Sequence, residues 1–311
     1  MLVLFRKITF PVEVEAIMFV TFLTFIVNFV VVTWILLWTQ TVYPFKFPEL
    51  LQFMQWADIP YNIGNTSMIV ATVILMVPFM LSHTRLMQYV LVKTLGCRTP
   101  SADERQYLEQ IVKFLCQRSG ESPNKYHLYV KRDDTLNAFA VGRDNICVHT
   151  GLLNVMNAPQ VAAIVAHEMG HIQNNDTIYG VGCGAIAWAG NGVVQLYVTF
   201  IRILSIFASL PIIGWLIAII ILFVNLQLCV MQFFLNLPLQ LINMFSSRQN
   251  EYAADRYACE IGLGRELYEG LAILMKFSGE SKMGFFSNLM STHPATPKRL
   301  ARIQEYLNGT V

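Results

Sequence analysis

Four long stretches without Asp, Glu, Lys or Arg constrain the fold of this chain more than any other feature. They cover residues 16–45, 59–84, 177–201 and 203–247. A helix needs about 20 apolar residues to cross the hydrocarbon of a bilayer, and each stretch is long enough. The last one exceeds a single span, and Pro211 and Gly214 indicate a turn before a helix over residues 212–237. The sequence therefore predicts four transmembrane helices.

The basic residues indicate how these helices are oriented. Two precede the first stretch, ten lie between the second and third, eight follow the fourth, and each remaining connection holds one. Because Lys and Arg are enriched on the cytoplasmic side, both termini and the central segment are expected there. The first stretch is too long for the apolar part of a signal peptide and lacks a small-residue cleavage pattern, so it is expected to remain as an anchor.

Charge and cysteine content exclude several classes of protein. A net charge of +2 with scattered basic residues gives no footprint for nucleic acid. The six cysteines form no Cys-x-x-Cys pair, and four of them fall in the segments expected in the cytoplasm, so neither a disulfide framework nor a cysteine metal site is indicated. The predicted spans carry no ionisable pair facing a pathway, which disfavours a transporter.

The soluble part of the chain must be assembled from two pieces, residues 86–176 and 248–311. They alternate with an N-terminal pair of spans, residues 1–85, and a second hairpin of spans, residues 177–247. Capping-box patterns begin two helices of the first piece at Ser101 and Asn157. The remaining predicted elements are strands over residues 127–130, 137–141 and 145–149 and helices over residues 250–263, 266–277 and 296–307.

The segment His167-Glu168-Met169-Gly170-His171 is an H-E-x-x-H pattern on a predicted apolar helix. Helical residues four apart project from one face, so both imidazoles can reach one metal ion. Glu168 is then placed to take a proton from the attacking water and to deliver it to the leaving amine. The competing interpretation is a helix with two ordinary histidines, which would need other buried partners. The pattern predicts a catalytic site with one Zn²⁺ per chain.

A catalytic zinc of this kind takes a third protein ligand. A further histidine is excluded, because Asn174 and Thr177 stand where the extended pattern requires glycine and histidine. Glu251 is the candidate, since the predicted hairpin of spans returns it to the side of the membrane that the histidines occupy; Glu260 is the nearest competitor. Asp255 is expected to accept a hydrogen bond from the distal N–H of a ligand histidine. The predicted fold is thus a mostly α membrane protein with four transmembrane helices and a cytoplasmic α+β, zincin-like metalloprotease domain containing a small sheet.

Other residues leave alternatives open. His293 stands before a proline and six residues ahead of Arg299, and its chemistry alone does not decide between a functional and a structural role. A short edge strand near Phe139 or Val148 could pair with an extended peptide through main-chain hydrogen bonds, whereas an ordinary internal strand could not.

Jointly, these motifs resemble the HtpX-type membrane metalloproteases, which are related to the CAAX prenyl proteases. The likeness covers essentially the whole chain and includes N-A-F-A-x-G at residues 137–142, T-G-L-L at 150–153, H-E-M-G-H, E-Y-A-A-D at 251–255, and T-H-P with a following arginine. It implies the following roles: His167, His171 and Glu251 bind zinc, Glu168 is the base, Asn137 lies beside the substrate strand, and His293 with Arg299 holds the oxyanion or the substrate backbone.

The resemblance also implies substrates and a location. It points to damaged or misassembled membrane proteins, cleaved on the cytoplasmic side of the bacterial inner membrane in quality control and the stress response. Two alternatives stand beside this hypothesis. A prenyl-protein protease is disfavoured because four spans cannot form a many-helix chamber, and a membrane scaffold with a structural metal is disfavoured because it has no use for Glu168.

Overall fold

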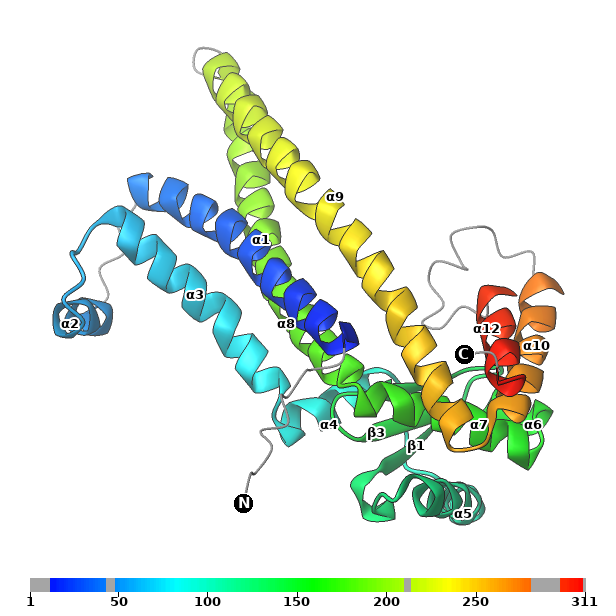
Figure 1. Ribbon diagram of the computed structural model, residues 1–311. Coiled ribbons are helices and arrows are strands. Elements are labelled where there is room, and N and C mark those ends of the chain that lie inside the picture. Colours follow the sequence, from blue (N-terminus) through cyan, green and yellow to red (C-terminus); the bar gives the residue numbers. More distant parts are fainter. Residues whose placement is uncertain (1–11, 43–47, 210–213, 281–296, 310–311) are drawn as a thin grey trace. The chain divides into compact units, whose positions relative to one another are not determined.

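The computed structural model describes residues 12–42, 48–209, 214–280 and 297–309 (Figure 1). The chain forms two compact units that alternate along the sequence. One unit combines the chain before Phe19 with His83–Val181 and Phe245–Val311; the other combines Phe19–Ser82 with Gly182–Met244. The first contains the sheet and is called the sheet unit, and the second is called the helical unit.

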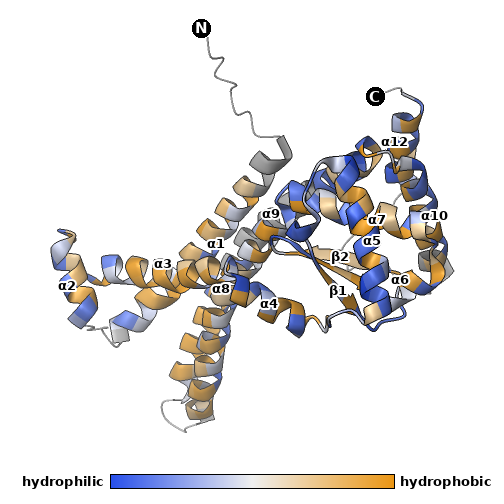
Figure 2. Ribbon diagram, turned by 90° about the horizontal axis from the view of Figure 1, so that it is seen from below, coloured by the Kyte–Doolittle hydropathy of each residue, from blue (hydrophilic) through white to orange (hydrophobic). Residues whose placement is uncertain are grey.

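The helical unit is built from long apolar helices: α1 (Val12–Val42), α3 (Ile63–Ser82), most of α8 (Asp176–Ser205) and the first part of α9 (Gly214–Glu260), with the short α2 (Pro48–Trp56) and η2 (Ile206–Ser209). Figure 2 shows α1, α3 and α8 as predominantly hydrophobic. Within the described residues, three segments are long and apolar enough to cross a membrane, Met18–Thr41, Ile63–Ser82 and Asp176–Ala208. Gln40 Nε2 donates to Ser67 Oγ at 2.7 Å, which satisfies two buried polar groups between α1 and α3.

The predicted fourth span falls within α9, a single helix of 47 residues. The shorter apolar segment described there is Gly214–Val230, so the number of four spans stays a prediction. The separate helix expected from residue 250 is wrong, because residues 250–260 are the C-terminal end of α9 itself. A change from apolar to polar sequence does not end a helix; Gly262, with φ +81°, does so just beyond Glu260.

The described residues of the sheet unit form three strands, β1 (His127–Lys131), β2 (Ala138–Val141) and β3 (Asn145–His149), in the order β1-β3-β2. β3 pairs in parallel with β1 and antiparallel with β2. The three predicted strands are therefore confirmed, with β2 beginning one residue later than expected. Val148 lies in the central strand, so the internal-strand alternative holds at that position, whereas Phe139 lies in an edge strand, β2.

Helices cover both faces of this sheet. On one face, α5 (Ala102–Ser119) and α7 (Ala158–Gln173) bury a core that includes Leu115, Ile146, Val148 and Val165. The other face packs Val141 and Cys147 against the end of α4 (Arg85–Thr94). The remaining elements of the unit are η1 (Pro123–Lys125), α6 (Thr150–Val155), α10 (Gly264–Glu280) and α12 (Pro297–Leu307). The capping boxes predicted at Ser101 and Asn157 are confirmed.

Candidate active site and metal centre

Helix α7 carries the H-E-x-x-H motif through the centre of the sheet unit. Its start is fixed by the reciprocal hydrogen bonds between Asn157 and Gln160. Every residue from Gln160 to Ile172 is buried, and His167, Glu168 and His171 are 2%, 2% and 4% exposed. Polar side chains at this depth are costly unless each one is hydrogen-bonded, paired or bound to a cation.

Gly170 allows the C-terminal part of α9 to approach α7 closely. A Cβ placed on Gly170 would lie 2.9 Å from Ala254 Cα and 3.2 Å from Tyr257 Cβ, which is too close for a real side chain. The glycine inside the H-E-x-x-H motif therefore lets the two helices approach until side chains on α9 reach the histidines. This close packing is what joins two segments that are some 80 residues apart in the sequence.

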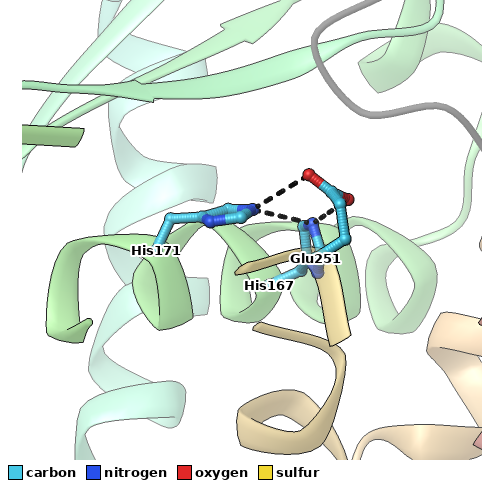
Figure 3. A group of neighbouring side chains, drawn as sticks. All are labelled: His167, His171 and Glu251. Atoms are coloured by element: carbon cyan, nitrogen blue, oxygen red, sulfur yellow. Dashed lines mark hydrogen bonds and ion pairs between the residues drawn. The ribbon is translucent and has the colours of Figure 1, made fainter. Parts of the chain in front are cut away.

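Three side chains from these helices converge on one point, as Figure 3 shows. His167 Nε2 lies 3.2 Å from His171 Nε2 and 3.4 Å from Glu251 Oε2, and His171 Nε2 lies 3.5 Å from Glu251 Oε1. Ligands at about 2.0–2.1 Å from a tetrahedral zinc ion are separated by about 3.3–3.4 Å. The donor set, two imidazoles and a carboxylate, and its spacing therefore both fit a zinc ion. Glu260 is exposed at the end of α9 and belongs to no such group among the described residues.

Two carboxylates lie at the distal nitrogens of the histidines. Asp255 Oδ1 is 3.0 Å from His167 Nδ1, in the position expected from the sequence. Asp176 Oδ2 is 2.8 Å from His171 Nδ1. Both contacts favour the tautomer that leaves Nε2 free to bind a metal. The sequence motifs did not predict this role for Asp176. Its position five residues after His171, next to the end of the motif helix, could have indicated a contact with that histidine.

Arg299 from α12 joins the two carboxylates of α9. Its Nε and Nη2 contact both oxygens of Asp255 at 2.8 and 2.7 Å, and its Nη1 lies 2.7 Å from Glu251 Oε2. The guanidinium is 2% exposed. Burial lowers the pKa of Arg299, but the Asp255 and Glu251 carboxylates outweigh that effect and raise it, so the group stays charged.

The described part of the site carries more negative than positive charge. Four buried or nearly buried carboxylates, those of Glu168, Asp176, Glu251 and Asp255, face the single guanidinium of Arg299 when the histidines are neutral. Burial alone would lower the pKa of His171, but hydrogen bonds to Asp176 and Glu251 raise it to about 10. A site that attracts protons this strongly is suited to a divalent cation, which supplies the same compensation.

Glu168 contacts the edge of the sheet. Its Oε2 accepts a hydrogen bond from Ala140 N at 2.9 Å. Immediately before β2, Asn137 O accepts a hydrogen bond from His149 N and so faces β3. Main-chain groups of successive residues point to opposite sides of a strand, so those of Ala138 and Ala140 point away from β3. Among the described residues no further strand pairs with this edge of β2, which runs beside the carboxylate that the motif identifies as the base.

The other predicted site residues are placed as follows. Asn137 is half-buried immediately before β2, and Phe139 lies within β2 and packs edge-to-face on His149 with ring centroids 5.8 Å apart. The prediction for His293 falls outside the described residues. Arg299 contacts ligands and their partners, and its predicted role toward an oxyanion stays a prediction.

A buried H-E-x-x-H helix, with a glutamate from a second helix at the same point, defines the metallopeptidase class of site. The chain belongs to peptidase family M48, whose family model matches residues 102–307. It is therefore a metalloprotease, and the resemblance expected from the motifs is confirmed. Peptidases of this family are zinc enzymes.

Individual proteins are similar to this chain. The chain is 27% identical to Protease HtpX of Legionella pneumophila (strain Lens) over 232 residues, which cover 64% of this chain and 75% of the relative. It is 28% identical to a Protease HtpX homolog of Dictyoglomus thermophilum over 242 residues, or 69% and 74% of the two chains. The crystal structure of S. mikatae Ste24p is similar at 19% identity with a TM-score of 0.48, covering 82% of this chain and 61% of that chain.

Proposed function

We propose that this metalloprotease is a zinc endopeptidase of the bacterial inner membrane that cleaves damaged or misassembled membrane proteins on the cytoplasmic side. The observation that carries the proposal is the convergence of His167, His171 and Glu251, with donor atoms 3.2–3.5 Å apart, beside Glu168 and an open strand edge. The four spans predicted from the sequence and the excess of basic residues in the central and C-terminal segments support the orientation.

The chain's own residues divide the work of peptide hydrolysis. His167, His171 and Glu251 would hold the zinc, while Asp255 and Asp176 hold the two imidazoles in their binding orientation. Zinc in such a site polarises the scissile carbonyl and lowers the pKa of water to about 7. Glu168 takes the proton of the attacking water on a carboxylate oxygen and gives it to the nitrogen of the leaving amine.

Substrate binding is proposed along the free edge of β2. The outward N–H and C=O groups of Ala138 and the outward C=O group of Ala140 offer a strand to which an extended polypeptide can add, next to Asn137 and Phe139. The N–H of Ala140 already donates to Glu168 Oε2. Main-chain pairing gives affinity with little sequence preference, which suits a protease of misfolded chains. Arg299, together with His293, is proposed to stabilise negative charge on the carbonyl oxygen of the substrate.

The experiment compares the purified full chain with Glu168→Gln, and uses Glu109→Gln, an exposed residue of α5, as the matched control. Zinc content and cleavage of an unfolded membrane protein are measured for all three. We expect about one zinc per chain in each, with cleavage lost by at least about 100-fold in Glu168→Gln alone. Unchanged cleavage in Glu168→Gln would overturn the proposed mechanism and favour a scaffold. Cleavage restricted to peptides that end in a prenylated cysteine motif would favour a prenyl-protein protease instead.

The third ligand is tested separately. Glu251→Gln removes the negative charge of the carboxylate proposed as the third zinc ligand, whereas Glu260→Gln alters an exposed carboxylate on the same helix. We expect zinc to be lost from the first variant on dialysis and to be retained by the second. Equal retention in both variants would assign the third ligand to another residue.

A further inference from the structure

Exposed apolar side chains of the sheet unit are concentrated on one short helix. Among its described residues outside α1, nine large hydrophobic residues are exposed, and five of them lie between residues 86 and 95. These are Leu86 (74% exposed), Met87, Tyr89, Val90 and Leu95. The 18-residue helix α5, by contrast, exposes only one large hydrophobic side chain, that of Phe114. A cluster of this kind marks a contact surface rather than ordinary scattered exposure.

The inner face of α4 is already occupied by the sheet. Gln88 and Val92 are 4% and 1% exposed. Gln88 Oε1 accepts from Arg143 N at 3.2 Å in the turn between β2 and β3, and Val92 packs with Val141 and Cys147 on the sheet. The exposed apolar residues therefore lie on the face of α4 that the described residues of its own unit leave uncovered.

The position of α4 in the chain identifies what covers this face. Only His83 and Thr84 separate it from the end of α3, one of the candidate membrane-spanning helices. Three residue steps reach at most about 11 Å, so α4 begins within about 11 Å of the point at which a membrane-spanning α3 would leave the hydrocarbon. The helix contains no acidic residue, and its Arg85 and Lys93 are exposed. Basic residues beside an apolar face are typical of helices that lie on anionic bilayers.

We propose that α4 is an interfacial helix that inserts Leu86, Tyr89 and Val90 into the boundary between headgroups and acyl chains of an anionic phospholipid bilayer. Because Gln88 and Val92 pack on the β2–β3 hairpin, this contact holds edge strand β2 at the membrane surface. That consequence rests on the proposed function: a polypeptide leaving the bilayer would meet the free edge of β2, with Glu168 beside it, before it could move into bulk water.

Lipid contact is tested in the full chain without reference to activity. Bimane is attached to a single cysteine at Leu86→Cys, Val90→Cys or the control Glu109→Cys, with the native cysteines replaced by serine and folding verified by zinc content. The proteins are placed in nanodiscs of phosphatidylglycerol and phosphatidylcholine, with and without brominated acyl chains. We expect fluorescence at positions 86 and 90 to fall at least about twofold with brominated lipid and the control to be unaffected. Equal quenching at all three positions would overturn the proposal.

A second comparison tests the consequence for substrate capture. The double variant Leu86→Glu/Val90→Glu changes two exposed residues of α4, and Phe114→Glu makes the same change on α5. We expect the double variant to cleave a bilayer-embedded substrate about tenfold more slowly and a water-soluble unfolded polypeptide at the wild-type rate, with Phe114→Glu unaffected. Equal loss on both substrates would show that α4 supports folding rather than capture. If the wild type cleaves neither substrate, the proposed function fails, while the quenching experiment still decides the lipid contact.

Discussion

His171 and Asp176 form a contact of 2.8 Å between Nδ1 and Oδ2 that joins the motif helix to the first residue of α8. Asp176 stands at the start of a helix whose later residues form an apolar, membrane-length segment. One of the two imidazoles proposed to bind zinc is therefore oriented by the same short connection that leads the chain from the sheet unit toward the helical unit. The other, His167, is oriented by Asp255 on α9.

Asp176→Asn is expected to weaken zinc binding by about 10- to 100-fold, because an amide cannot supply the charge that fixes the His171 tautomer. The measurement is competition with a zinc chelator of known affinity. Asp134→Asn, which alters an exposed carboxylate in the same unit, serves as the control. An affinity within a factor of two of wild type in Asp176→Asn would show that the contact has no part in holding the metal.

Gly170→Ala is expected to destabilise the sheet unit by about 1–3 kcal/mol and to lower zinc occupancy, because the added Cβ would separate α9 from α7 at Ala254. Thermal unfolding in detergent and zinc content are measured together. Gly180→Ala is the matched control, since a Cβ there meets nothing within 4 Å. In an exposed helical position that change should be neutral or stabilising by up to about 1 kcal/mol. Equal behaviour of the two variants would contradict the close approach at Gly170.

Zinc binding is expected to release protons and to strengthen as the pH rises. In the metal-free site the pKa of His171 is raised to about 10, so the imidazole is protonated at neutral pH and must lose its proton to bind zinc. The dissociation constant should fall about tenfold per pH unit for each proton released, between about pH 6 and pH 8. Calorimetry in buffers of different ionisation enthalpy counts these protons. A pH-independent dissociation constant would contradict the prediction.

Glu104 is expected to contribute to stability above about pH 4.5 and to lose that contribution as the pH falls. Hydrogen bonds from Arg98 lower the pKa of Glu104 to about 2, and Ser101 adds to the effect. Because the folded-state value is depressed, the stabilisation is complete above the unfolded value of 4.5 and disappears as the pH approaches 2. The pair is partly exposed, so Glu104→Gln should lower the free energy of unfolding by about 1 kcal/mol at neutral pH. Denaturant unfolding at several pH values, with Glu109→Gln as the control, measures the difference.

Much of the sheet unit could be predicted because its signals are local. The capping boxes at Ser101 and Asn157 fix two helix starts, and alternating apolar residues indicate the three strands. The helix boundary expected at residue 250 is wrong because a change from apolar to polar sequence does not interrupt a helix; α9 continues through Pro238 and ends at Glu260, just before Gly262. The choice between Phe139 and Val148 for an edge strand stayed open because strand order cannot be obtained from the alternation within a single strand.

The sequence by itself determined the apolar spans and the pairing of His167 with His171, because hydropathy over about 20 residues and helical spacing of four residues are properties of adjacent chain. Only the tertiary structure placed the Glu251 carboxylate rather than Glu260 beside the two imidazoles, Asp176 and Arg299 next to that group, and the edge of β2 beside Glu168. These contacts depend on the close packing of α7 and α9 at Gly170 and on the order of the strands, both of which are set by the fit of side chains distant in the sequence.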